Sequence, residues 1–254
     1  MESLSRLSRL STAPGEARPR TAGFTLIEML IVLAIIMVLV VIALTSQSSF
    51  NRSFLLSNTA YDIALTMRGA QNYGVGGRTI GSGTVGYGLD FQKSSPTSFL
   101  LFADSYPGLS GWPLCHETPL QSQPGSQPGD CRYTAGQDTQ VASYTIGNGI
   151  SIEDLCVYVA GPNAWECASN NAFSQLDIVF ARPNAVPYLS AGSGGTNIGW
   201  LCSAGNYDNS YVPYCTLSET ITKACIKLTS ANGGLKVVEV NAAGEITANG
   251  DTCS

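Results

Sequence analysis

The sequence predicts an α+β protein in which one long N-terminal α-helix, a membrane-spanning half followed by a stem, packs on an antiparallel β-sheet head with disulfide-stapled loops. Three observations support this prediction. An unbroken apolar run lies near the N-terminus, and short apolar segments separated by glycine and proline follow from about residue 85. All eight cysteines lie between Cys115 and Cys253.

The first 22 residues are polar and contain four arginines together with Pro14 and Pro19. Prolines disfavour a helix here, and positive charges beside an apolar run tend to stay on the cytoplasmic side of a membrane. We therefore expect a disordered cytoplasmic segment, with the remainder of the chain after the apolar run on the other side.

The apolar run extends from Phe24 to Leu44, and Thr25 and Glu28 are its only residues that are not hydrophobic. As an α-helix, 21 residues span about 30 Å, the thickness of the hydrocarbon core of a bilayer. A secretory signal is disfavoured because its apolar core is only about 7–15 residues long and an A-x-A-like cleavage site should follow it. A plain signal anchor fits the length, but it gives Glu28 no role.

Glu28 is the residue that needs an explanation, since a carboxylate within hydrocarbon costs roughly 2.5–3.5 kcal/mol on insertion scales. The stretch Gly-Phe-Thr-Leu-Ile-Glu, followed by the apolar run, resembles the class III leader of type IV pilins and type II secretion pseudopilins. This resemblance implies that a prepilin peptidase cuts between Gly23 and Phe24 on the cytoplasmic side and methylates the new amino terminus. The implied segments are a cleaved leader (1–23), a transmembrane and filament-core helix (24–44), an amphipathic helical stem (45–73) and a β-rich extracytoplasmic head (74–254).

The resemblance also suggests a partner for Glu28. In a filament of packed apolar helices, its carboxylate can meet the amino group of a neighbouring subunit's Phe24, because paired charges are tolerated in a low dielectric where single charges are not. We expect Glu28 to set the axial register of assembly. The implied partners are the prepilin peptidase, other pilin or pseudopilin subunits and an inner-membrane assembly platform. The implied location is the inner membrane as a single-pass protein before assembly, and an extracellular filament afterwards.

The helix is predicted to continue through the stem, since residues 45–73 contain no proline and no glycine before Gly69. Phe50, Phe54, Tyr61 and Leu65 recur at helical spacings on about one face. We expect this aromatic and aliphatic stripe to pack on the sheet of the head.

After the stem, Gly81–Gly86 matches the pattern G-x-G-x-x-G of dinucleotide-binding proteins. That pattern binds a pyrophosphate only where a strand precedes it and a helix follows it. Here a predicted helix precedes it and a predicted strand follows, so we expect a loop and no cofactor.

The strands of the head are predicted from apolar alternation and turn residues, with turn signals at 147–149 and at 230–234. The pair GYGLDF and SFLLFAD resembles the first hairpin of the GspH/FimT branch of pseudopilins and minor pilins. Residues 105–140 and 188–220, which are rich in glycine, proline and polar residues, are predicted to be exposed loops. The predicted strands are 85–91, 98–103, 141–146, 150–159, 176–181, 224–229, 235–240 and 245–248.

The even number of cysteines on the exported side predicts disulfides, which persist in oxidising compartments. Eight cysteines allow on the order of a hundred connectivities, so the sequence does not fix the pairing. Zinc is disfavoured because there is no C-x-x-C pair and the single histidine, His116, adjoins a cysteine. A calcium loop of the D-x-[DN]-x-[DN]-G type is also absent from the sequence. The pairs suggested by local loop lengths are Cys115–Cys131, Cys156–Cys167, Cys202–Cys215 and Cys225–Cys253.

The composition disfavours two further classes of function. Catalysis of the Ser/His/Asp type needs a base, and one histidine in a proline-flanked loop is a poor candidate, so we expect no enzyme. Nucleic-acid binding needs a basic face. Beyond residue 23 the chain has nine basic and 16 acidic residues, a net charge of −7, and residues 241–254 contain Glu245 and Asp251 but no lysine or arginine.

Three functions therefore remain open. The first is a structural subunit, a minor pilin, of a type IV pilus-like filament that assembles through its N-terminal helix. The second is a type II secretion pseudopilin that serves protein secretion. The third is a minor pilin for adhesion or DNA uptake, and it rests on loop aromatics and three lysines: Trp112, Trp200, Tyr207, Tyr211, Tyr214, Lys223, Lys227 and Lys236.

Overall fold

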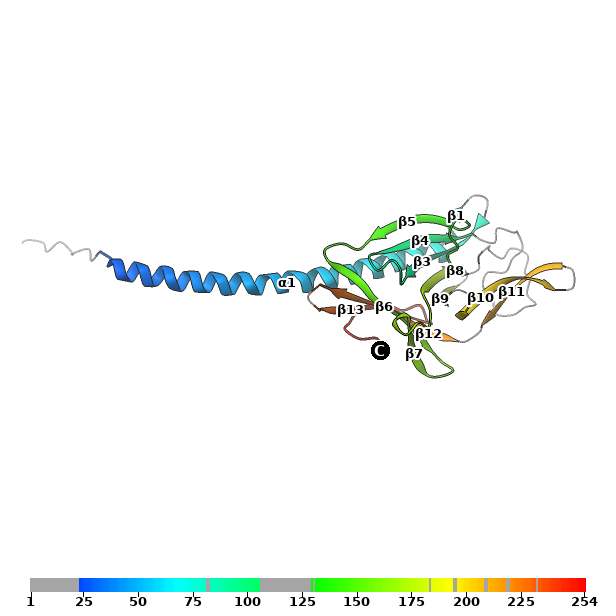
Figure 1. Ribbon diagram of the computed structural model, residues 1–254. Helices are drawn as coiled ribbons and strands as arrows, with labels where there is room; N and C mark the ends of the chain where they lie inside the picture. Colours follow the sequence, from blue (N-terminus) through cyan, green and yellow to red (C-terminus); the bar gives the residue numbers. More distant parts are fainter. Residues whose placement is uncertain are drawn as a thin grey trace, which may run out of the picture. The chain divides into compact units, whose positions relative to one another are not determined.

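The computed structural model describes residues 23–80, 83–105, 129, 131–182, 184–193, 196–207, 210–217, 220–231 and 233–254 (Figure 1). The chain divides into two units, residues 1–47 and 48–254, and we call the second unit the head. Helix α1 (Leu26–Val75) begins in the first unit and continues into the second. The predicted continuation of the helix beyond Leu44 is thus confirmed, and so is the α+β class.

The head contains two large antiparallel sheets and a small pair of strands, β1 (Thr79–Ile80) and β2 (Gly83–Thr84). The seven-stranded sheet consists, in spatial order, of β11 (Ser210–Leu217), β10 (Thr196–Tyr207), β9 (Asn184–Ser193), β8 (Gln175–Ala181), β3 (Gly86–Gln92), β4 (Ser98–Asp104) and β5 (Thr139–Thr145). The five-stranded sheet consists of β14 (Ile246–Gly250), β13 (Leu235–Asn241), β12 (Ile221–Ser230), β6 (Ile150–Val159) and β7 (Ala164–Cys167), followed by the 3-10 turn η1 (Ala168–Asn170).

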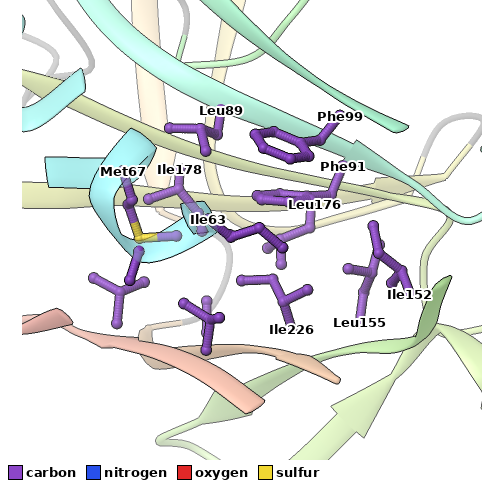
Figure 2. Close-up of a cluster of buried hydrophobic side chains, with 14 of the residues drawn as sticks. Ile63, Met67, Leu89, Phe91, Phe99, Ile152, Leu155, Leu176, Ile178 and Ile226 are labelled. Carbon is purple, nitrogen blue, oxygen red and sulfur yellow. The ribbon is translucent and has the colours of Figure 1, made fainter. Parts of the chain in front are cut away.

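The main core lies between these two sheets, and the stem part of α1 contributes one of its walls. Figure 2 shows Ile63 and Met67 of the helix beside Leu89 and Ile178 of the seven-stranded sheet, with Ile226 of the five-stranded sheet on the other side. The helix also bonds to the backbone of both sheet regions, because the Gln71 side-chain amide donates to the carbonyl of Ala185 at the start of β9 and to that of Gly244 in the turn between β13 and β14.

The face of α1 that is buried differs from the predicted face. Phe54, Tyr61 and Leu65 are 59%, 48% and 59% exposed, and the side chain of Phe50 lies outside the described residues. The buried positions recur at the same helical period but are smaller: Leu56, Ala60, Ile63, Ala64, Met67 and Ala70. Small side chains allow close approach, and at Gly74 an added Cβ would lie 2.1 Å from the carbonyl oxygen of Phe180. The helix therefore packs on the sheets through the face that carries the smaller side chains, not through its most aromatic face.

The glycine-rich turn at 147–149 does not form a hairpin. β5 before it pairs with β4, whereas β6 after it pairs with β12 in the other sheet. Asn148 and Gly149 adopt positive φ angles of 60° and 70°, which turn the chain from one sheet to the next. The predicted turn at 230–234 does join paired strands, β12 and β13, and β3 and β4 likewise form the predicted hairpin.

Residues 188–220 are largely strand, so their prediction as a loop is wrong. β9, β10 and β11 occupy most of this region despite Pro187 and Pro213. Proline is tolerated on edge strands and beside irregular pairing. Pro213 lies on the edge strand β11, and Pro187 lies opposite Phe180, where the register of β8 and β9 shifts. Of the other predicted loop, only Ser105, Gly129 and residues 131–140 are described, and Thr139 and Gln140 begin β5.

Two disulfides lie side by side on the outer face of the five-stranded sheet. The structure contains Cys156–Cys167 and Cys225–Cys253, the same pairs that the local loop lengths suggest. Cys156 and Cys225 are opposite each other on β6 and β12, and both pack on Val237.

The two other suggested disulfides stay predictions. Cys131 is disulfide-bonded, and Cys115 lies outside the described residues. The register of β10 and β11 places the backbone of Cys202 opposite that of Cys215, which allows that pair.

Burial of the small helix face leads to a direct prediction. Ile63→Ala should lower the free energy of unfolding by roughly 2–5 kcal/mol, because it leaves a cavity between the helix and the sheets. Leu65→Ala, two residues away on the exposed face, is the matched control and should change it by no more than about 0.5 kcal/mol. Urea unfolding of the full chain in detergent micelles measures both values, and equal losses would contradict the assignment of faces.

Candidate functional site

The candidate site is the start of α1, where Gly23, Phe24 and Thr25 precede the first helical turn. Thr25 caps the helix: the backbone N–H of Glu28 lies 3.3 Å from the Thr25 side-chain oxygen and 3.1 Å from its carbonyl oxygen. The N–H of Met29 donates to the same carbonyl at 3.2 Å. The first four N–H groups of an α-helix have no partner within the helix, and the Thr25 cap satisfies one of them with a side chain.

Glu28 is the third residue of the helix, and its position has an electrostatic consequence. A negative charge in the first turn complements the partial positive charge of the helix N-terminus. Thr25 and Glu28 also match the capping-box pattern S/T-x-x-E, a signal of a helix start that is present in the sequence itself. Glu28 therefore contributes to the start of the helix, in addition to any role between subunits.

All described side chains from Gly23 to Leu44 are exposed in the isolated chain. Phe24 is 76% exposed, and no heavy atom lies within 4 Å of a Cβ placed on Gly23, so the Gly23–Phe24 peptide bond is unobstructed by the described residues. Leu26–Leu44 forms 19 helical residues of mean hydropathy 3.2, long and apolar enough to cross a membrane by length and composition. Such an apolar surface needs lipid or other apolar helices around it.

Two other groups of residues that could suggest chemistry have structural roles. Ligand atoms of Asp154, Cys156 and Cys167 lie within 4.8 Å of one another, but both sulfurs belong to one disulfide and offer no thiolate. The Asp154 carboxylate accepts bonds from the N–H and the hydroxyl of Ser169 at 2.9 and 2.7 Å, which fix the turn after β7.

The glycine pattern at 81–86 does not meet the geometry of a dinucleotide site either. Gly83 lies on β2 and Gly86 begins β3, so a strand follows the pattern where a helix would be needed. His116 lies outside the described residues.

The fold and this helix start define a class of protein: a β-rich head preceded in the chain by a helix whose first part is apolar except for Glu28. Residues 18–44 match the family model of the prokaryotic N-terminal methylation motif. This match supports a class III leader of the kind found in type IV pilins and pseudopilins, and with it a type IV pilin-like or pseudopilin subunit. No curated protein and no solved structure matches the chain, so its assignment to the GspH/FimT branch stays a prediction.

The capping bond at Thr25 can be tested directly. Thr25→Ala should weaken the first turn by about 1 kcal/mol, which corresponds to a roughly five-fold lower hydrogen-exchange protection of the Glu28 N–H. Thr25→Ser keeps a hydroxyl cap and serves as the control, with protection close to that of the unchanged protein. Amide exchange by NMR of the full chain in micelles gives both values; equal protection in the two variants would show that the cap does not hold this turn.

Proposed function

We propose that this protein is a structural subunit, a minor pilin, of a type IV pilus-like filament. A prepilin peptidase cuts the chain between Gly23 and Phe24 and methylates the new amino terminus. Before assembly, the subunit is a single-pass protein of the inner membrane with its head outside the cytoplasm. It then joins the filament through contacts of residues 24–44. The observation that carries this proposal is the methylation motif at residues 18–44, which overlaps a helical segment, Leu26–Leu44, long and apolar enough to cross a membrane.

In this proposal Glu28 has two partners in succession. In the single chain its charge complements the start of α1, and in the filament it pairs with the methylated amino group of a neighbouring Phe24. The carboxylate lies on the third helical residue and the amino group forms four residues before it, so both charges belong to the same end of each helix. A neighbour shifted along the filament axis brings them together, which would fix the register.

The outer face of the stem offers a second surface for neighbouring subunits. Phe54, Tyr61 and Leu65 are large, exposed and spaced on one face of the helix within the head. Contiguous exposed apolar side chains commonly mark protein interfaces. We infer that this stripe continues the contacts made by residues 24–44.

A type II secretion pseudopilin is the second candidate. Its support is the β3–β4 hairpin, which carries the GspH/FimT-like residues and lies within the seven-stranded sheet with all six residues from Gly86 to Phe91 paired. The same processing and helical assembly apply to both candidates.

The structure gives less support to DNA uptake. Lys223 lies 3.6 Å from Glu239, and Lys236 contacts Asp251, so two of the three candidate lysines already have carboxylate partners. Lys227 is directly opposite Asp154 on the neighbouring strand. Neutralised lysines release few counterions from a phosphate backbone. For adhesion, Trp200 and Tyr207 lie on β10 and Tyr211 and Tyr214 on β11, where only the backbone is described.

Processing is the first prediction of this proposal. Intact-mass spectrometry of the protein from cells with an active prepilin peptidase should show a chain that begins at N-methylated Phe24. Protein from cells without the peptidase should retain residues 1–23. An uncut chain in the peptidase-positive cells would contradict the proposal and leave a plain membrane-anchored domain.

Incorporation into filaments is the second prediction of this proposal. Glu28→Gln should still be cut at Gly23 but should enter sheared filaments at least about ten-fold less than the unchanged subunit, because the amino group of its neighbour is left without a countercharge. Glu28→Asp keeps the charge and should recover part of the incorporation. Immunoblots of filament and membrane fractions measure the ratio, and normal incorporation of Glu28→Gln would exclude the proposed pairing.

A further inference from the structure

A short segment, the strap (residues 131–138), covers part of the outer face of the seven-stranded sheet. Cys131 of the strap is buried with Phe102 of β4 and Val179 of β8 in a small apolar cluster separate from the main core. The Tyr133 ring packs on this cluster, with its centroid 5.3 Å from that of Phe102. The strap therefore shields apolar side chains on a face opposite to the helix.

The described strap is tied down through side-chain carboxylates. Its internal turn is closed by the N–H groups of Gln137 and Asp138, which donate to the Thr134 carbonyl. The Tyr133 carbonyl accepts the Gln175 side-chain amide at 3.1 Å. Three further backbone N–H groups of the strap donate to aspartates, so its seating depends in large part on the charge state of acids. These bonds are Cys131 N–H to Asp104 at 2.8 Å, Tyr133 N–H to Asp177 at 3.1 Å, and Thr134 N–H to Asp138 at 2.7 Å.

One of these acids, Asp177, faces another across the sheet. Asp90 of β3 and Asp177 of β8 are directly opposite in the strand register, and they are 2% and 0% exposed. Like charges in opposite positions destabilise a sheet, and burial increases the penalty. The strap supplies one cation, Arg132, whose Nε lies 4.0 Å from an Asp177 oxygen. Two buried carboxylates thus share one nearby positive charge.

Hydrogen bonds are divided unequally between the two carboxyl groups. Asp177 accepts the Tyr133 N–H and the Gln175 side-chain amide, the latter at 2.9 and 3.2 Å. Asp90 accepts one bond, at 3.0 Å from Gln92, and its second oxygen, Oδ1, is buried without a hydrogen-bond partner. A buried acceptor without a donor is costly, and a proton between the two carboxyl groups removes that cost.

Electrostatics agree with this geometry. Burial raises the pKa of Asp90 to about 6, against the weaker opposing effect of the neighbouring Gln92, Asp177 and Gln175 side chains and of the Arg132 charge. Burial, followed by the negative charge of Asp90, raises the pKa of Asp177 well above its ordinary value. Of the strap's other groups, the Tyr133 phenol has a pKa raised by burial and by the charges of Asp90 and Asp138.

We propose that Asp90 and Asp177 form a proton-binding pair that holds the strap on the sheet, so that loss of protons from the pair releases it. This inference goes beyond the proposed function and does not depend on it. Release takes Cys131 and Tyr133 off Phe102 and Val179, so that more of these two apolar side chains is exposed on the outer face of the sheet. The head can therefore present different surfaces at acidic and at neutral or alkaline pH.

The expected direction of the pH effect on the strap follows from the raised pKa values of Asp90 and Asp177. An acid whose pKa is higher in the folded state stabilises the fold fully below its ordinary pKa, 3.8 here. That contribution is lost as the pH rises through the folded value, about 6 for Asp90. The strap should thus be seated near pH 5 and looser near pH 8.

The test is amide hydrogen exchange of the full chain in detergent micelles at pH 5 and pH 8, corrected for the intrinsic pH dependence of exchange. The protection factor of the Tyr133 N–H should fall at least about ten-fold between the two values, since one pKa unit corresponds to a factor of ten. The Ile226 N–H, on the central strand β12 of the other sheet, is the internal control and should keep its protection.

Two variants distinguish an effect of the Asp90–Asp177 pair from a general effect of pH on the protection of Tyr133. Asp90→Asn keeps the shape and lets an amide donate to Asp177, so the fall at Tyr133 should shrink to less than about three-fold. Asp177→Asn should also lose the pH dependence, but with lower protection at both pH values because the strap loses its ionic contact with Arg132. If Asp90→Asn does not fold, Asp177→Asn still decides the question.

Three results would overturn the proposal. The first is constant protection of Tyr133 in the unchanged protein, and the second is an undiminished pH dependence in both variants. The third is recovery of full protection at pH 8 on addition of calcium chloride, which would make the pair a cation site instead of a proton site.

Discussion

The structure depends on one constraint, the close approach of the stem helix to two β-sheets at once. Ala60, Ala64 and Ala70 of the helix are buried in the shared core. Ile63 and Met67 lie in the same core beside side chains of the sheets (Figure 2). Gly74 marks the limit, because any side chain there would collide with the backbone of β8. Packing at this density leaves few ways to accommodate larger residues. The two sheets therefore share one core that neither could complete without the helix.

A single helix meets two different requirements along its length. From Leu26 to Leu44 it is apolar on every side, as expected for a segment that is surrounded by lipid or by other helices. Within the head it is apolar on two faces of different kinds: a small face buried in the core, and the large exposed residues Phe54, Tyr61 and Leu65. The side chains of this second face are 48–59% exposed in the isolated chain. This asymmetry is what a subunit needs if its helix both supports its own head and contacts neighbours.

The outer faces of the two sheets are stabilised by local devices, not by a second core. On the five-stranded sheet, two adjacent disulfides and Val237 form a compact cluster that fixes the C-terminus. On the seven-stranded sheet, the strap packs on Phe102 and is held by aspartates. Covalent bonds do not respond to pH, whereas buried carboxylates do. The two faces of the head therefore differ in the kind of condition that can alter them.

The sequence by itself determined the features that depend on neighbours along the chain: the leader with Gly23, Phe24 and Glu28, the continuous helix, the β3–β4 and β12–β13 hairpins, and the local disulfides Cys156–Cys167 and Cys225–Cys253. Only the tertiary structure decided which helix face is buried, since hydrophobicity favoured Phe54 whereas fit to the sheet favoured Ala60. It also placed β5 and β6 in different sheets and kept Pro187 within a strand, where irregular pairing accommodates its missing N–H. Asp90 and Asp177 are 87 residues apart in the sequence, and only the register of β3 and β8 brings them together. Contacts between distant segments depend on shape and pairing, and no local pattern encodes them.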